Sequence, residues 1–154
     1  MKAFLITPDH AMQMCVVQEV EVRASDDDGA DVSHIWELLN ADCFDVVRSK
    51  HGSFANHCVY VDGEGLLKPQ AGHILCQDLY PLPLAGSLLL LGEKFNPEEG
   101  WITSAATLGV AAVRDLFSKA YVSRRFAKAA HDLAELQMMQ ANPEMIVMRV
   151  SSEM

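Results

Sequence analysis

Apolar and polar residues alternate along residues 14–22, MCVVQEVEV, with valines at most even positions and two glutamates at odd positions. A period of two is typical of a strand with one face exposed to solvent. The apolar run at residues 2–7, KAFLIT, ends at Pro8 and predicts another strand. A turn over residues 8–12 would join these two strands as an antiparallel hairpin.

The middle of the chain contains its two most hydrophobic short runs, each bounded by Gly or Pro, as is typical of buried strands. The segment DGEG at residues 62–65 predicts a tight turn, after which Leu66 and Leu67 could pair back as the second arm. The strands predicted in this region are residues 43–48, 56–62 and 86–95.

Helical spacing begins at residues 31–40, where Ile35, Leu38 and Leu39 stand at i, i+3 and i+4 after a capping Asp31 or Ser33. Residues 70–80 follow Pro69, a residue suited to the first helical position, and repeat apolar residues at helical spacing. These two segments predict two short helices.

The C-terminal third predicts a helical segment that starts at Thr103 and stops at Pro143. Two apolar stripes in this segment are out of phase, which predicts a bend near residues 122–123. EMIVMRV at residues 144–150 alternates and predicts a last strand, which could pair two copies of the chain as a homodimer.

Together these elements predict an α+β fold: a mainly antiparallel sheet of five to six strands, two short helices, and a C-terminal helical segment packed on one face. A length of 154 residues is suited to one domain. We therefore expect a single domain over residues 1–154, with an acidic α+β body at 1–100, the helical segment at 101–143 and the final strand at 144–150.

Charge is unevenly placed. Residues 1–100 contain 6 Lys and Arg against 16 Asp and Glu, a net charge of -10, whereas residues 101–154 contain 6 against 5, a net charge of +1. An acidic surface repels nucleic acid, so direct nucleic-acid binding is disfavoured. No apolar run approaches the ~18–20 residues that cross a bilayer, and the N-terminal residues do not resemble a signal peptide. These features predict a cytoplasmic protein that does not bind membranes.

No sequence motif for catalysis, nucleotide binding or a cofactor is present, which favours a non-enzymatic protein without cofactors. The four cysteines stand singly among apolar residues and predict buried free thiols. A zinc site was the alternative, since His73 and Cys76 share one side of the predicted second helix and His57 with Cys58 could complete four ligands. Neither half matches a zinc signature, so packing is the preferred interpretation.

The middle of the chain also resembles a known family. FDVV at residues 44–47, VYVDGEGLLK at 59–68, a helix ending at Leu79-Tyr80, and PLAGSLLLLGE at 83–93 occur in an order that resembles the small proteins of phages, plasmids and integrative elements called domain of unknown function 3846. The resemblance covers about residues 1–93. It implies the N-terminal hairpin and a mobile-element context, and it supplies no catalytic residue.

The resemblance and the charge distribution lead to a functional expectation. We expect an accessory protein of a phage or mobile element that binds a host or competing-element protein, including inhibition of a defence system such as a CRISPR nuclease. The alternative is a small-molecule or nucleotide binder, with a pocket between the sheet and the helices near residues 62–65 or His73. The predicted partner-binding residues come from two acidic turns and the one basic cluster: Asp26, Asp27, Asp28, Asp62, Glu64, Arg114, Arg124, Arg125 and Lys128. The aspartates of residues 24–30 lack the spacing of a calcium loop, so we interpret this segment as a solvated loop.

Overall fold

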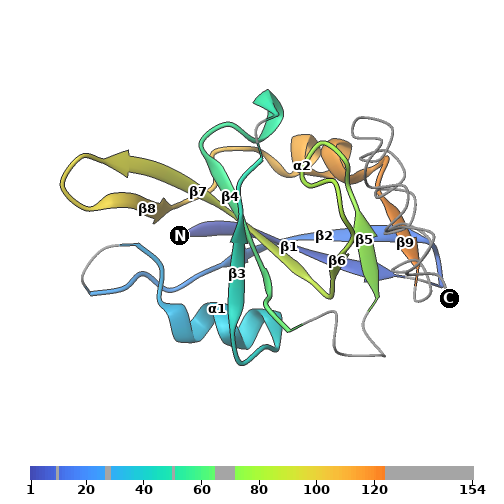
Figure 1. The fold of residues 1–154 in the computed structure, drawn as a ribbon, viewed down its shortest axis with the longest axis horizontal. Coiled ribbons are helices and arrows are strands. Elements are labelled where there is room, and N and C mark those ends of the chain that lie inside the picture. Colours follow the sequence, from blue (N-terminus) through green and yellow to red (C-terminus); the bar gives the residue numbers. More distant parts are fainter. Residues whose placement is uncertain (10, 27–28, 50, 65–71, 124–154) are drawn as a thin grey trace, which may run out of the picture.

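The computed structural model describes residues 1–9, 11–26, 29–49, 51–64 and 72–123. They form an α+β fold dominated by an antiparallel sheet, with two helices, as the sequence predicts (Figure 1). The larger sheet has six strands in the order β2-β1-β7-β4-β3, with β8 pairing with β7. These strands are β1 (Lys2–Asp9), β2 (Met14–Glu21), β3 (Phe44–Val47), β4 (His57–Asp62), β7 (Leu88–Asn96) and β8 (Gly100–Ser104).

A smaller sheet that the sequence did not predict lies beside the larger one. Its strand order is β6-β5-β9, formed by β6 (Leu84–Ala85), β5 (His73–Leu75) and β9 (Tyr121–Ser123). The helices among the described residues are α1 (Val32–Leu39) and α2 (Val110–Phe117), together with a short 3-10 helix at Gly52–Phe54.

The core has two layers because β7 is covered on both faces. Leu88 and Leu90 pack with residues of the smaller sheet and α2, whereas Leu89 and Leu91 pack with residues of α1. Successive side chains of a strand point to opposite faces, so an unbroken run of four leucines requires apolar cover on each side. All four leucines are fully buried.

The predicted N-terminal hairpin, first helix and three middle strands are confirmed, with ends that move by no more than two residues. The β1–β2 hairpin pairs from Lys2 with Glu21 to Asp9 with Met14. The predicted turn after β4 is present over its described residues, where the Glu64 N–H donates to the Asp62 side chain at 3.0 Å. The second arm at residues 66–67, the helix beyond residue 123 and the last strand at 144–150 lie outside the described residues.

The helix predicted at residues 70–80 is wrong over its described part. Residues 73–75 form β5, which pairs with both β6 and β9. Ile74, Leu75 and Leu79 satisfy helical spacing, but every residue from His73 to Cys76 is buried. Continuous burial suits a strand covered on both faces, and periodicity alone does not separate it from a buried helix.

The predicted start of the C-terminal helix at Thr103 is also wrong. Residues 100–104 form β8, in register with β7 from Gly92 opposite Ser104 to Asn96 opposite Gly100. The helix begins only at Val110, after Gly109, and the chain returns to strand at residues 121–123, where a bend had been predicted. Trp101, Ile102 and Thr103 are aromatic or β-branched residues, which strands favour.

Candidate protein-binding groove

Strand β3 ends the larger sheet on one side. It pairs with β4, and within the described part of the chain no strand pairs with its other side. The Gly63 N–H donates to the Cys43 carbonyl at 3.2 Å. Because the backbone groups of a strand alternate between its two sides, every second residue from Cys43 bonds toward β4. The N–H and C=O groups of Phe44 and Val46 therefore point to the open side.

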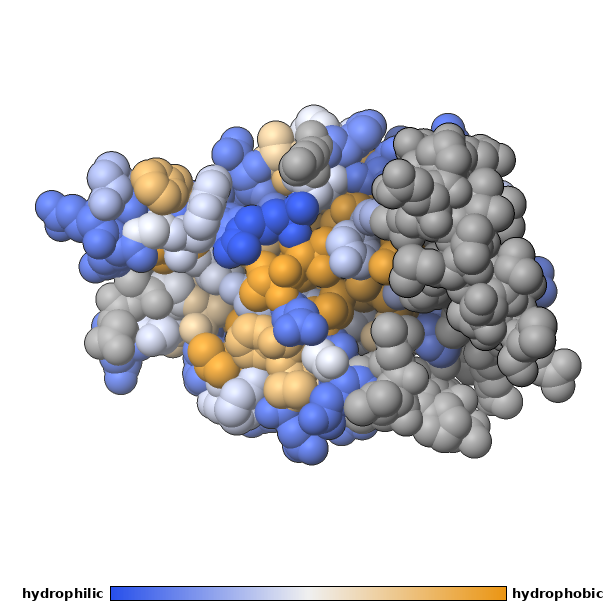
Figure 2. All heavy atoms as spheres, viewed as in Figure 1, coloured by the Kyte–Doolittle hydropathy of each residue, from blue (hydrophilic) through white to orange (hydrophobic). Residues whose placement is uncertain are grey.

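A groove of about 490 Å³ runs beside this open edge. Val47 and Val61 of the larger sheet line one wall, and Leu82, Leu84 and Ala85 line the other, close to the smaller sheet. Figure 2 shows hydrophobic atoms gathered at the centre of this face of the molecule, with hydrophilic atoms around them. The groove thus combines an apolar floor with a strand edge whose backbone can form hydrogen bonds.

One end of the groove is acidic. Asp45 and Asp62 line it, and their negative charges act on the nearby Cys43 thiol together with those of Glu64 and Asp42. Desolvation raises the pKa of this thiol most, and the four negative carboxylates raise it further. A positively charged side chain placed at this end would be attracted to several carboxylates together.

Arg48 stands at the other end of the groove, where it forms a bidentate ion pair with Glu93. Its Nε lies 2.9 Å from both carboxylate oxygens of Glu93, and its Nη2 lies 2.6 Å from Oε1. Only 6% of the Glu93 side chain is exposed, against 48% for Arg48. The hydrogen bonds that Arg48 donates to the Glu93 carboxylate raise the pKa of Arg48, which keeps the guanidinium charged.

Two exposed aromatic side chains continue this surface onto the β7–β8 hairpin, which projects from the body (Figure 1). The Arg48 guanidinium lies over the Trp101 ring, 5.8 Å from its centroid. The rings of Trp101 and Phe95 contact edge to face, with their centroids 5.3 Å apart. Trp101 is 54% exposed and Phe95 is 61% exposed. We call the groove, Arg48, Trp101 and Phe95 together the β3 face.

The structure brings two of the nine predicted partner-binding residues into this site. Asp62 and Glu64 belong to its acidic end. Asp26 is exposed in the loop before α1, and Arg114 is exposed on α2, where it lines a different hollow with β2. Asp27, Asp28, Arg124, Arg125 and Lys128 lie outside the described residues.

Sequence reasoning missed Asp45, Arg48, Phe95 and Trp101. Asp45 carried a usable signal, because it is a charged residue between apolar neighbours of a short strand. No sequence signal indicated the role of Arg48, because its partner Glu93 is 45 residues away in the chain. Only strand pairing across β4 and β7 brings these two side chains together.

The residues of the alternative zinc site do not come together as metal ligands among the described residues. His57 Nδ1 lies 2.9 Å from the Ala55 carbonyl, and its Nε2 accepts the Thr107 N–H at 3.1 Å. Both ring nitrogens of His57 are therefore used within the fold. Among the described residues, no group of three or more His, Cys, Asp or Glu side chains could hold a metal ion.

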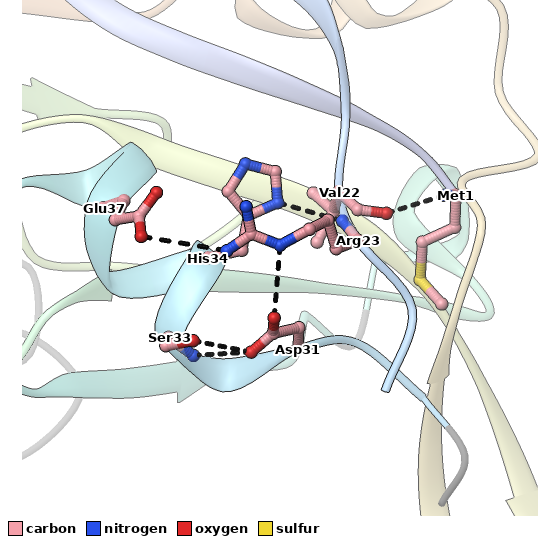
Figure 3. Close-up of polar contacts among 7 residues, drawn as sticks. All are labelled: Met1, Val22, Arg23, Asp31, Ser33, His34 and Glu37. Carbon is pink, nitrogen blue, oxygen red and sulfur yellow. Dashed lines mark hydrogen bonds and ion pairs between the residues drawn. The ribbon is translucent and has the colours of Figure 1, made fainter. Parts of the chain in front are cut away.

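A second polar cluster joins the end of β2 to the start of α1 (Figure 3). The Arg23 N–H donates to His34 Nδ1 at 2.9 Å, and Arg23 Nε donates to Asp31 at 3.2 Å. Asp31 also caps α1 by accepting the Ser33 N–H at 3.1 Å, which satisfies one of the free N–H groups at the start of the helix. These contacts fasten α1 to the sheet, and we interpret the cluster as structural.

Burial holds the thiols in their protonated form. Desolvation raises the pKa of Cys15 and of Cys58 to about 12, and it also raises the pKa of Cys76. A thiol attacks as its thiolate, so these cysteines are poor nucleophiles near neutral pH. The neighbouring Tyr60 hydroxyl, which contacts Thr103, has its pKa raised by burial to about 12 as well.

These shifts predict a loss of stability in alkali. The pKa of these thiols is near 9.0 in the unfolded chain and about 12 for folded Cys15 and Cys58. Stability is therefore complete below pH 9 and falls as the pH rises toward 12, by up to about 1.4 kcal/mol per pH unit for Cys58 and by less for the partly exposed Cys15. Urea unfolding at several pH values measures this loss of stability. Cys58→Val should lose less stability than wild type over this interval, and equal losses would contradict the assignment.

Comparisons with protein-family models, with curated proteins and with solved structures found no match. Within the described part of the chain, neither helix has the length and apolar character needed to span a membrane.

Proposed function

We propose that this chain is a non-enzymatic accessory protein of a phage or mobile element that binds a host or competing-element protein through the β3 face. The observation that carries the proposal is the exposed Phe95–Trp101 pair beside an apolar groove and Arg48. Trp, Tyr and Arg side chains around a concave apolar floor are the residues that dominate binding energy at protein interfaces. The protonated thiols are consistent with a binding role.

The acidic charge of the body suggests the kind of partner. Residues 1–100 have a net charge of -10. Such a field is attracted to a basic nucleic-acid channel, where the protein would compete with DNA or RNA. Inhibition of a defence nuclease, for example a CRISPR nuclease, is the activity we propose for that partner, and its affinity should weaken as salt rises from low to physiological concentration.

Affinity capture with the full tagged chain from host-cell extract tests the proposal. We expect wild type to retain a specific protein. The double variant Phe95→Ser/Trp101→Ser should retain about tenfold less of it, because exposed aromatic anchors contribute most of the binding energy. Met12→Ser is the matched control, since Met12 is 68% exposed on the distant β1–β2 turn. Equal capture by both variants, or no protein retained by wild type, would reject the proposal.

A small-molecule site is the second candidate, favoured by the volume of the groove. About 490 Å³ is within the range of ligand pockets, and the groove lies beside Asp62 and Gly63. A thermal-shift screen with nucleotides, signalling dinucleotides and metal ions separates the candidates, since a bound ligand raises the melting temperature. Asp45 and Asp62 would repel a phosphate group, so we expect no rise with nucleotides.

A further inference from the structure

We infer that the open edge of β3 accepts an extended segment of the protein partner as an additional strand, with a basic side chain beside Asp45 and an apolar side chain two residues away beside Val47. This inference rests on the proposed function and specifies how that partner is bound. It follows from the direction of the backbone groups, the side chains of β3 that face the groove, and the charge at its end.

The backbone of β3 provides the first step. Its hydrogen bonds to β4 use alternate residues, which leaves the N–H and C=O groups of Phe44 and Val46 directed to the open side. An added strand satisfies such groups with main-chain hydrogen bonds, which give affinity without a specific sequence. The two outward-pointing residues are separated by one position, which is the repeat of an antiparallel ladder.

The side chains of β3 provide the second step. Asp45 and Val47 stand opposite Val61 and Val59 on β4, and they line the groove. An added strand would place every second side chain on this same face. The two side chains next to Asp45 and Val47 would then lie two residues apart in the partner segment.

Charge complementarity defines the occupant. The carboxylates of Asp45 and Asp62 line one end of the groove, so a Lys or Arg is favoured there and an acidic side chain is excluded. Farther along, Leu82 and Leu84 face Val47 across the groove, so the next inward-facing side chain is expected to be apolar. β6, which contains Leu84, is the end strand of the smaller sheet, so the groove runs between the end strands of two sheets.

Strand β2, the opposite end of the larger sheet, is less suited to this role. The side chains of Glu19 and Glu21 on this strand are exposed. Charged side chains along an edge strand are a common device that prevents pairing with another chain. β3 instead combines half-buried valines with one charged residue at the groove.

A selection from a library of displayed peptides of about ten residues, with the full chain immobilised, tests the inference. We expect enriched peptides to contain Lys or Arg two positions from Val, Ile or Leu. Fluorescence polarisation with the synthetic consensus peptide then measures affinity. Val46→Pro removes an N–H that points outward, a position where an edge strand tolerates proline, so it should fold and weaken binding about tenfold or more.

Val46→Ala is the matched control, because it loses the same side chain but keeps the N–H; we expect it to bind within about threefold of wild type. Asp45→Lys should weaken the basic peptide about tenfold and favour a peptide with Glu in its place. Circular dichroism of each variant confirms folding. Failure to enrich such peptides, or equal binding by Val46→Pro and Val46→Ala, overturns the inference.

The same variants separate this inference from the proposed function. If host-cell protein is captured through Phe95 and Trp101 but Val46→Pro captures it as well as Val46→Ala, the chain is a binding protein and strand addition is wrong. If peptides add to β3 but no protein is captured from the host, strand addition stands and the proposed function is wrong.

Discussion

Replacing Gly92 with alanine is expected to lower the free energy of unfolding by about 3 kcal/mol, because strand β7 has no room for a Cβ atom there. A Cβ atom added at Gly92 would overlap the Ala105 carbonyl group. It would lie 2.9 Å from the carbonyl carbon of Ala105 and 2.8 Å from the Ser104 Oγ. The backbone cannot move away easily, since Gly92 pairs with His57 on one side and Ser104 on the other.

Urea unfolding followed by circular dichroism measures this loss. Gly52→Ala is the matched control, because a Cβ at Gly52 meets nothing within 4 Å. We expect the control to change stability by no more than about 0.5 kcal/mol. Similar stability of both variants would show that the close contact between β7 and the chain after β8 is relaxed in solution.

Replacing Arg48 with methionine is expected to cost about 2 kcal/mol, because it leaves the Glu93 carboxylate buried without its cation. The value lies below the full cost of breaking a buried pair because Arg48 is 48% exposed, so water can reach the site. Methionine keeps much of the apolar length of the side chain, which limits the effect of lost packing. Urea unfolding at neutral pH is the measurement.

A double-mutant cycle isolates the charge contribution. Arg48→Met/Glu93→Leu removes both charges, and an apolar pair of similar size is often neutral in place of a buried ion pair, so most of the stability should return. If Glu93→Leu adds its own full loss to that of Arg48→Met, the two side chains do not interact as described. Arg48→Met also tests the β3 face, since it removes the guanidinium that lies over Trp101.

Local pattern was sufficient for the parts of the fold whose partners are close in sequence or whose burial is one-sided. The alternation in residues 14–22 identified β2, and the spacing of Ile35, Leu38 and Leu39 identified α1. The glycine-flanked leucine run identified β7 as a buried strand. These elements have periodicities that only one kind of structure satisfies.

The remaining elements depend on tertiary contacts that sequence does not display. Residues 73–75 form a strand because β6 and β9 lie on either side of them, and their partners in β9 are 46 to 50 residues later in the chain. The acidic end of the groove was predicted only in part for the same reason: Asp62 and Glu64 were visible as a turn, whereas Asp45 joins them through the pairing of β3 with β4. Whether the resemblance to the mobile-element family reflects kinship stays a prediction.

The position of β7 in the middle of the larger sheet has a consequence for biosynthesis. Ile6 of β1 pairs with Leu88 of β7, so β1 meets this neighbour only after about 80 more residues have been translated. At roughly 5–20 residues per second, this delay is on the order of 4–16 s. During that time, β1 cannot yet pair with the leucine-rich strand β7. We therefore expect the apolar side chains of β1 to stay exposed on the ribosome until β7 has been translated and the sheet can close.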